Sequence, residues 1–297
     1  MRSVSRGSSS ARAAADRALR GALERLRGSG PVLVPEYPLE LRARWGWDGA
    51  LPLTAVDALL RERSRDYEDT IDAVRSMLEW ARTIPRATES LGQPCWENDW
   101  WGTVDALTQC AALRRRDPAL YLEIGSGYST LFARKAIDDF GLRTKIVSID
   151  PAPRREVDAR CDEVIRKPLQ DVAAGLADRL SAGDVVLVDC SHVALMNTDA
   201  TVFFLEVLPR LPAGVLVGVD DIFLPWDYPP AWDRRVYAEQ YLLAAFLIGG
   251  GAGFSVRFPG WWVMHRPPLA ERLSDVWPVV ENRFGRHATS FWLERDS

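Results

Sequence analysis

The sequence predicts an α/β fold in which helices cover both faces of a mostly parallel, Rossmann-like sheet. From Ala119 onward, short runs rich in Val, Ile and Leu alternate with longer segments of helical pattern, which is typical of a parallel sheet. The first apolar run ends at Ile124, in a glycine-rich turn. A second run ends on Asp150, twenty-five positions beyond Gly125. A strand, a tight turn, a helix and a carboxylate-tipped strand predict a site for a nucleoside-like cofactor.

The expected strands are short apolar runs, and the expected helices are the longer segments between them. Together they predict one Rossmann-like domain over residues 117–297. Strands are expected at 119–124, 145–149, 163–166, 184–189, 214–220, 254–258 and 289–294. Helices are expected at 129–140, 152–160, 170–180, 198–210, 233–248 and 268–283.

The chain before residue 117 has a different texture, with helical patterns separated by loops rich in Pro and Trp. Residues 31–116 are expected to form a helical cap region. One long amphipathic helix is expected at 54–82, and a second helix is expected at 103–115, leading toward the glycine turn.

The first 30 residues are rich in Arg, Ser and Ala. We expect a flexible tail and a short amphipathic helix over 1–30, with the helix at 11–27. An organellar presequence has a similar composition. However, Asp16 and Glu24 interrupt the basic face of the helix, which favours the tail-and-helix interpretation.

Composition argues against two classes of partner. A net charge of −4 gives no electrostatic case for nucleic acid, which binds basic surfaces. No apolar stretch approaches the roughly 20 residues that cross a bilayer, so no membrane partner is expected. The four cysteines show no paired metal-ligand spacing. Reduced thiols without an export signal predict a cytoplasmic protein.

The glycine turn distinguishes between two nucleoside cofactors. A dinucleotide fingerprint has a third glycine where the helix packs closely on the strand, but this chain has Thr130 there. Glu123, just before the turn, would repel a pyrophosphate and attract a cationic ligand. These residues favour S-adenosylmethionine, which carries a sulfonium and an amino group but no phosphate.

Several separated motifs resemble those of class I S-adenosylmethionine-dependent methyltransferases. More narrowly, the chain resembles a bacterial O-methyltransferase-like family that carries a Glu-Ile/Val-Gly-Ser-Gly-x-Ser-Thr motif. The resemblance covers roughly residues 96–297 and implies a seven-stranded sheet whose last strand is antiparallel. The motifs are Leu122 to Thr130, Ser148 to Pro151, Leu187 to His192, Asp221 to Pro229, Glu239 to Leu243 and Ser290 to Leu293.

The resemblance implies cofactor-binding roles position by position. The turn residues would surround the methionine portion, Asp150 and Pro151 would lie at the ribose, and Asp189 would face the sulfonium. A carboxylate suits the ribose because it accepts hydrogen bonds from both hydroxyls. The alternative role of Asp150 is a helix N-cap. Leu169 and Gln170 would border the adenine. The turn residues are Glu123, Gly125, Ser126, Gly127, Tyr128 and Ser129.

Four polar residues should meet at the carboxyl ends of neighbouring strands, where open α/β sheets bind ligands. They are Asp189, His192, Asp220 and Asp221. One hypothesis makes His192 the general base, with Asp189 and Asp221 as catalytic partners. A second, compatible hypothesis places a divalent metal such as Mg²⁺ on Asp189, Asp220 and Asp221. In the third, some of these residues only cap helices or order the loop.

The chain departs from the family across the fifth strand. Relatives carry His-x-His-Asp there, whereas this chain has Gly218-Val219-Asp220-Asp221. The absence of both histidines favours an oxygen-ligand metal site over the family's usual handling of the proton.

Aromatic residues crowd the region after the acidic pair. Trp226 and Tyr228 are expected to line an apolar acceptor pocket that excludes water. The tryptophans nearer the end of the chain are expected in the core. They are Trp261, Trp262, Trp277 and Trp292.

The sequence thus predicts a cytoplasmic enzyme that transfers a methyl group from S-adenosylmethionine to an oxygen of a small-molecule acceptor. Catalysis would come from positioning in a dry pocket and from deprotonation by His192 or a metal. The N-terminal helices would form either a lid over the acceptor or a homodimer contact. Two alternatives are a nicotinamide-dependent oxidoreductase on the same fold and a non-catalytic relative that binds S-adenosylmethionine.

Overall fold

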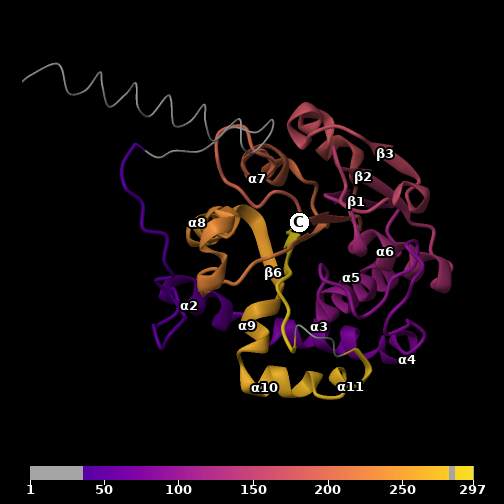
Figure 1. Ribbon diagram of the computed structural model, residues 1–297, viewed down its shortest axis with the longest axis horizontal. Coiled ribbons are helices and arrows are strands. Elements are labelled where there is room, and N and C mark those ends of the chain that lie inside the picture. The colour runs from indigo at the N-terminus through magenta and orange to yellow at the C-terminus, as the bar shows by residue number, and fades with distance from the viewer. Residues whose placement is uncertain (1–35, 281–284, 297) are drawn as a thin grey trace, which may run out of the picture. The chain divides into compact units, whose positions relative to one another are not determined.

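The computed structural model describes residues 36–280 and 285–296 of the 297-residue chain. The chain divides into two units, Met1–Arg42 and Ala43–Ser297, and the second contains every helix and strand of the described residues (Figure 1). The tail and the helix expected over residues 1–30 lie outside the described part. No helix within that part is long and apolar enough to cross a membrane.

The described residues form one seven-stranded sheet, with the strand order β3-β2-β1-β4-β5-β7-β6. The strands are β1 Leu120–Ile124, β2 Lys145–Ile149, β3 Glu163–Ile165, β4 Val185–Val188, β5 Leu216–Val219, β6 Phe254–Pro259 and β7 Phe291–Arg295. β1 to β5 pair in parallel, whereas β7 is antiparallel to both β5 and β6. The predicted fold class and the seven predicted strands are therefore confirmed (Figure 1).

The parallel register aligns the ends of the central strands. Ile124 in β1 lies opposite both Ile149 in β2 and Val188 in β4. Val188 in turn lies opposite Val219 in β5. Because these residues close their strands at the same level, the residues after them emerge together at one edge of the sheet. Those residues are Gly125, Asp150, Asp189 and Asp220.

Helices of very different lengths surround the sheet (Figure 1). The α-helices are α2 Thr54–Glu62, α3 Asp66–Arg75, α4 Leu78–Ala81, α5 Thr103–Arg116, α6 Tyr128–Phe140, α7 Asp199–Val202, α8 Glu239–Ile248, α9 Gly260–Met264, α10 Pro267–Ala270 and α11 Trp277–Val280. The 3-10 and π segments are η1 Asp158–Arg160, η2 Leu169–Asp171, η3 Ala173–Gly175, η4 Ala177–Arg179, η5 Phe203–Val207, η6 Leu208–Arg210, η7 Pro230–Arg235, η8 Gly251–Gly253 and η9 Glu271–Leu273.

The single long helix expected at 54–82 is instead three helices, α2, α3 and α4. α2 packs against α8, whereas α3 packs against α5 and β6. The chain must therefore turn between them, and Tyr67 Oη donates a hydrogen bond of 3.0 Å across this turn to the Leu60 carbonyl. The helix is interrupted because α2 and α3 pack against different elements, which the local hydrophobic periodicity cannot predict.

The helices expected at 152–160 and 170–180 are replaced by short 3-10 segments. In the first, Pro151 and Pro153 oppose an α-helix because proline lacks the N–H and restricts the residue before it. In the second, Gly175 interrupts the pattern.

Three other expected helices are irregular. The one expected at 198–210 passes from α7 into the π segment η5 and then η6. The one expected at 233–248 begins only at Glu239, behind η7. The one expected at 268–283 is divided into α10, η9 and α11, and residues 281–283 lie outside the described part.

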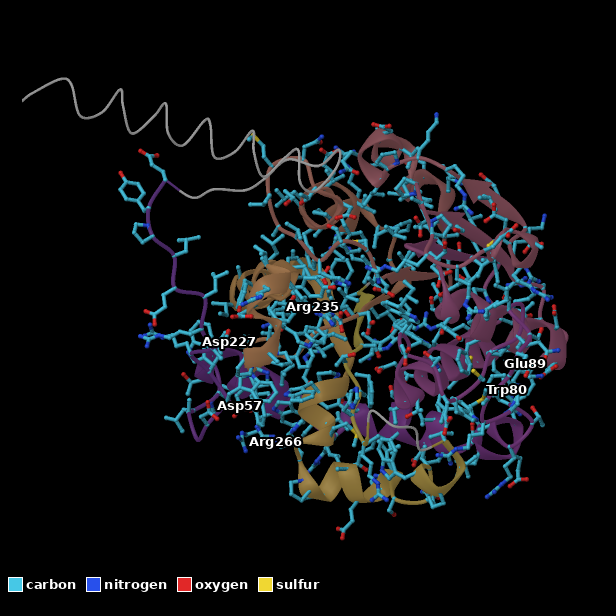
Figure 2. All side chains as sticks on the ribbon, viewed as in Figure 1. Asp57, Trp80, Glu89, Asp227, Arg235 and Arg266 are labelled. Carbon is cyan, nitrogen blue, oxygen red and sulfur yellow. The ribbon has the colours of Figure 1, made fainter. Side chains whose placement is uncertain are left out.

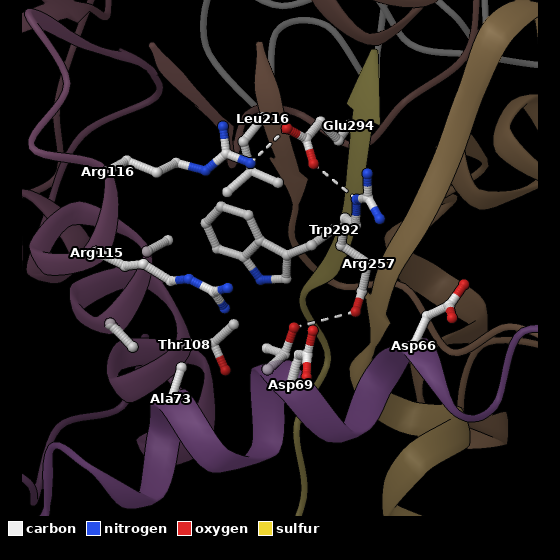
Figure 3. A pocket seen from close by; sticks show the side chains of 13 residues that line it. Asp66, Asp69, Ala73, Thr108, Arg115, Arg116, Leu216, Arg257, Trp292 and Glu294 are labelled. Atoms are coloured by element: carbon white, nitrogen blue, oxygen red, sulfur yellow. Dashed lines mark hydrogen bonds and ion pairs between the residues drawn. The ribbon is translucent and has the colours of Figure 1, made fainter. Parts of the chain in front are cut away.

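β7 enters the sheet between β5 and β6 through close packing. Trp292 is 1% exposed, and a Cβ atom at Gly218 of β5 would lie 2.8 Å from its ring. Further along β7, Glu294 forms ion pairs with Arg116 of α5 (2.6 Å) and Arg257 of β6 (2.7 Å), as Figure 3 shows. Only glycine at position 218 leaves room for this tryptophan beside the strand.

A buried carboxylate joins α2 to α9 (Figure 2). Asp57 accepts hydrogen bonds from Trp262 Nε1 (2.8 Å), from Arg61 Nη2 (2.7 Å) and from Arg266. Burial alone would raise the pKa of Asp57, but the bonds from Arg61 and Trp262 and the charges of both arginines outweigh it and lower that pKa below its usual 3.8. The ionised carboxylate is therefore the form that stabilises the fold.

We predict that Asp57→Asn lowers the free energy of unfolding at pH 7 by about 1–3 kcal/mol, because two guanidinium groups lose their charged acceptor. The folded-state pKa of Asp57 is depressed, so its stabilisation is present above pH 3.8 and is lost as the pH falls through the folded value. Urea unfolding at pH 7 and pH 3 measures both effects.

The matched control is Glu79→Gln, since Glu79 pairs with Arg82 at 3.5 Å while its side chain is 92% exposed. We expect little change there. Equal destabilisation by the Asp57 variant at pH 7 and pH 3 would contradict the electrostatic explanation.

Candidate functional site

A cavity of about 460 Å³ opens at the carboxyl edge of the sheet. Its wall combines the loop before α5, the glycine turn, the loop after β2, the ends of β4 and β5, and the segment around η7. Eight of the predicted site residues line it: Ser126, Gly127, Tyr128, Ser129, Asp189, His192, Asp220 and Asp221. The other predicted site residues lie outside this lining: Glu123, Gly125, Asp150, Pro151, Leu169, Gln170, Trp226 and Tyr228.

The two glycines of the turn have different reasons to be glycine. Gly125 has φ +83°, and a Cβ atom there would lie 1.7 Å from the carbonyl oxygen of Asp189. No side chain fits such a space. A Cβ atom at Gly127 would have nothing within 4 Å. Gly125 therefore permits the approach of two strand ends, whereas Gly127 keeps the cavity open.

Glu123 is fully buried and organises the turn from behind. Its Oε1 accepts a hydrogen bond of 3.0 Å from Tyr121 Oη, and its Oε2 accepts one from Thr130 Oγ1. Thr130 Oγ1 in turn accepts a bond of 3.0 Å from the backbone N–H of Gly127. Threonine at the third position of the fingerprint thus links Glu123 to the turn. The contact of Glu123 with a cofactor stays a prediction.

The position of Glu123 also affects its protonation. Burial raises the pKa of Glu123 to about 7, although the hydrogen bonds from Ser129, Thr130 and Tyr121 oppose the increase. A carboxyl group that titrates near neutral pH directly behind a ligand cavity responds to a nearby positive charge.

Asp150 is held against the glycine turn. Its Oδ2 accepts hydrogen bonds from the backbone N–H (2.9 Å) and the hydroxyl (3.2 Å) of Ser126. Its Oδ1 accepts one of 2.8 Å from the N–H of Ala152. The alternative of a helix N-cap is wrong, because no helix begins directly after Asp150. The next helical turn starts only at Asp158. The carboxylate therefore fixes the second strand end to the turn.

Gln170 carries an unsatisfied acceptor. Its Nε2 donates a hydrogen bond of 2.7 Å to the carbonyl of Asn197, but its buried Oε1 has no partner among the described residues. Leu169, its neighbour in η2, is buried in the core. A buried acceptor without a hydrogen bond is costly, so a further donor is expected at Oε1.

His192 lies between three carboxylates. Its Nδ1 contacts Glu239 Oε1, while its Nε2 lies 3.2 Å from Asp189 Oδ1 and 3.7 Å from Asp221 Oδ2. The ring of Tyr237 packs against the imidazole with centroids 4.4 Å apart. The predicted convergence of Asp189, His192 and Asp221 is thus present in the structure.

Glu239 is the member of this cluster that sequence reasoning missed as a site residue. It opens α8, 47 positions after His192, and it belongs to one of the motifs that carry the resemblance. Its neighbour Gln240 accepts a bond of 2.9 Å from the N–H of Phe223 and holds the loop after β5. One residue of α8 therefore orients the imidazole and the next orients the loop.

The pKa values of His192, Asp220 and Asp221 are all raised, so these groups hold their protons to higher pH than isolated residues would. Burial alone would lower the pKa of His192, but the charge of Glu239 and the hydrogen bonds to Asp189 and Glu239 raise it well above 6.5. Burial raises the pKa of Asp221 to about 7 against the opposing charge of His192. Burial and the charge of Asp221 raise the pKa of Asp220 well above its ordinary value.

The geometry does not support the metal hypothesis. Within residues 36–280 and 285–296, no group of three or more His, Cys, Asp or Glu side chains is arranged to hold a metal ion. Asp220 accepts a hydrogen bond of 3.2 Å from Thr289 Oγ1, while Asp189 and Asp221 face His192 Nε2.

The aromatic wall of the cavity differs from the prediction. Phe223, Trp232 and Tyr237 line it, whereas Trp226 and Tyr228 pack in an aromatic cluster beside it. Asp227 causes this placement, because its Oδ2 accepts bonds from the N–H groups of Arg44 (2.5 Å) and Trp45 (2.9 Å) and draws the loop toward them. Trp261 belongs to the same aromatic cluster, while Trp262, Trp277 and Trp292 are in the main core, as expected.

Two arginines that the sequence analysis did not single out, Arg154 and Arg155, also line the cavity. Arg155 Nη2 donates a hydrogen bond of 2.7 Å to Tyr128 Oη, and its Nη1 donates one of 2.6 Å to the Leu91 carbonyl. The Arg154 guanidinium lies 4.9 Å from the ring centroid of Trp100. These contacts join the loop after β2 to the loop before α5 across the glycine turn.

Comparison with known proteins identifies the segment that carries this edge of the sheet. Residues 122–222 match the family model described as a methyltransferase domain. The match runs from within β1 to just beyond β5 and contains the glycine turn, Asp150, Asp189, His192 and Asp221. The chain therefore contains a methyltransferase domain. No curated protein matches the chain.

Solved structures of low identity are similar in part. A SAH-bound methyltransferase from Podospora anserina, PaMTH1, has 19% identity, covers 62% of this chain and 82% of its own, and gives a TM-score of 0.36. A putative O-methyltransferase from Klebsiella pneumoniae has 12% identity, with 94% and 97% covered and a TM-score of 0.41. An O-methyltransferase from Bacillus cereus in complex with SAH has 14% identity, with 82% and 99% covered and a TM-score of 0.40.

We predict that the pKa of His192 lies above 6.5 and above that of His265. The chain has three histidines, so their Cε1–H signals can be followed by NMR as the pH is raised. The signal that disappears in His192→Gln should titrate above pH 6.5, or stay protonated throughout. In Glu239→Gln its pKa should fall, because the carboxylate charge that most raises it has been removed. His265, whose pKa burial lowers, provides an internal contrast. A His192 signal that titrates at or below 6.5 in the unaltered chain would contradict this prediction.

Proposed function

We propose that this methyltransferase domain transfers the methyl group of S-adenosylmethionine to an oxygen atom of a small-molecule acceptor. The observation that carries the proposal is the presence, in one cavity, of an open glycine turn and a buried histidine–carboxylate cluster. The turn provides room for a nucleoside cofactor, and the cluster provides a proton acceptor.

The residues at the cavity fit the cofactor. The space beside Gly127 is open. Gln170 lies outside the cavity lining, but its Oε1 is an acceptor without a partner among the described residues, which suits the amino group of an adenine. Ser126 to Ser129 would hold the amino-acid end, and Asp150 would hold the ribose. Bound S-adenosylmethionine would supply a methyl carbon made electrophilic by the positively charged sulfur. Asp189 would face that charge from the end of β4.

The histidine cluster would remove the proton of the acceptor hydroxyl. Glu239 fixes the imidazole through Nδ1, so Nε2 remains directed at Asp189 and Asp221, which line the cavity. Asp221 has a pKa of about 7 and His192 one above 6.5, so the cluster can take up a proton near or above neutral pH. We assign the catalytic roles to His192, Asp189 and Asp221, with Glu239 as a positioning residue.

This assignment needs no divalent metal. The acceptor oxygen would be activated by loss of its proton to the cluster, and Phe223, Trp232 and Tyr237 would keep water away from it. The nicotinamide alternative is disfavoured because Glu123 and Thr130 occupy the back of the turn. The non-catalytic alternative is disfavoured because buried groups with shifted pKa values, here His192 and Asp221, gather at functional sites.

We predict that Gly127→Val weakens binding of S-adenosylhomocysteine by about tenfold or more, which isothermal titration calorimetry measures. The valine would occupy open space in the cavity, so thermal unfolding should change little. Gly125→Ala is the contrast: its Cβ would meet the Asp189 carbonyl, so that variant should unfold at lower temperature. Unchanged affinity in a folded Gly127→Val protein would contradict the proposed cofactor site.

We predict an oxygen-methylated product. Protein supplied with trideuteromethyl-labelled S-adenosylmethionine and a panel of small phenols, alcohols and amines should label only hydroxyl groups, as mass spectrometry of the products will show. His192→Gln should slow the reaction by about 10²–10⁴-fold, the usual contribution of a general base. The control is His265→Gln, since His265 lies outside the cavity lining. Labelling of amines alone would contradict the choice of oxygen.

A further inference from the structure

The guanidinium of Arg235 belongs to the cavity lining and forms no ion pair with a carboxylate of the described residues. Its guanidinium carbon lies 3.8 Å from the ring centroid of Trp232 and 5.4 Å from that of Tyr237, and Nη1 is 3.5 Å from Tyr237 Oη. All three residues line the cavity. Two aromatic rings therefore hold the guanidinium in place while leaving its edge free to donate hydrogen bonds.

Several arginines outside the cavity lining are neutralised by carboxylates, whereas Arg154 and Arg155 in the lining contact Trp100, Tyr128 and the Leu91 carbonyl. Arg116 and Arg257 share Glu294 (Figure 3), and Arg266 pairs with Asp57 (Figure 2). Across the described ranges, by contrast, no carboxylate lies within ion-pair distance of Arg235. The cavity lining thus contains an exposed guanidinium that forms no ion pair within the described residues.

The residue after Arg235 has an unfavourable backbone conformation. Val236, next to Arg235, has φ +59°, which a β-branched residue rarely adopts. The turn is held because the carbonyl of His192 accepts hydrogen bonds from Ala238 (2.8 Å) and Glu239 (3.2 Å). The same turn therefore places Tyr237 on the imidazole and Arg235 at the cavity wall.

The charges of the cavity orient a ligand. An anionic group would be repelled by Asp189 and Asp221, which face His192, and attracted by Arg235. A hydroxyl group would instead be attracted to the carboxylates. The cavity wall is also aromatic, because Phe223, Trp232 and Tyr237 line it. A flat molecule with a hydroxyl at one end and an anion at the other matches all three features.

We propose that Arg235 binds a carboxylate of the methyl acceptor, so that the acceptor class is hydroxylated aromatic carboxylic acids. The inference rests on the proposed function, because it assumes that the hydroxyl at the histidine cluster receives the methyl group. A planar guanidinium recognises a carboxylate through two parallel hydrogen bonds, which neither an amide nor an ester can reproduce.

The test measures binding to the full chain saturated with S-adenosylhomocysteine. The probes are the ortho, meta and para isomers of hydroxybenzoate, each compared by calorimetry with its neutral hydroxybenzamide. The unaltered protein should bind at least one acid about tenfold more tightly than its amide. Arg235→Gln should abolish that preference. Arg234→Gln is the matched control, because Arg234 is exposed and lies outside the cavity lining, and it should keep the preference.

Each outcome separates this inference from the proposed function. If S-adenosylhomocysteine fails to bind the unaltered protein, the proposed function itself fails. If it binds but no acid is preferred over its amide, only the role of Arg235 is overturned. If Arg235→Gln weakens S-adenosylhomocysteine binding instead, Arg235 holds the carboxylate of the cofactor and the inference is wrong. Loss of the acid preference with cofactor affinity within about twofold supports it.

Discussion

The approach of Gly125 to the carbonyl of Asp189 is the contact on which the candidate site depends. A side chain at position 125 would lie 1.7 Å from that oxygen, so the ends of β1 and β4 come together only because the residue is glycine. The parallel register then brings Asp150 and Asp220 to the same edge. The cavity is therefore a consequence of backbone packing, and the polar side chains occupy positions that the sheet has already fixed.

The polar part of the cavity is a balance of buried charges. Asp189, Asp221 and Glu239 surround one imidazole, so the cluster is stable only with a proton on the ring or on a carboxyl group. A metal ion would compete with that proton for the same oxygens. Arg235 adds a second positive charge to the lining, and its charge lowers the pKa of Asp221. The proton of the His192 cluster and the guanidinium of Arg235 therefore add positive charge to a cavity whose other walls are aromatic.

The strands could be predicted from the sequence, whereas the helices often could not. Buried parallel strands are runs rich in Val, Ile and Leu, as in β2, β4 and β5. All seven strands lie at the predicted positions. The helix at 54–82 divides because its halves pack on different partners, which is tertiary information. The convergence of Asp189, His192 and Asp221 followed from strand ends. Glu239, Arg235 and Tyr237 were missed because α8 and the turn before it reach the site only after folding.

The position of β7 has a consequence for biosynthesis. β5 and β6 do not pair with each other. β7 lies between them in the sheet and follows both in the sequence. Thr289 and Ser290, just before β7, also donate their backbone N–H groups to the buried Asp105 at the start of α5. A ribosome must therefore release almost the whole domain before these hydrogen bonds can close. Until then the nascent chain exposes an unpaired edge at β5, where chaperones would bind and where premature termination would be most damaging.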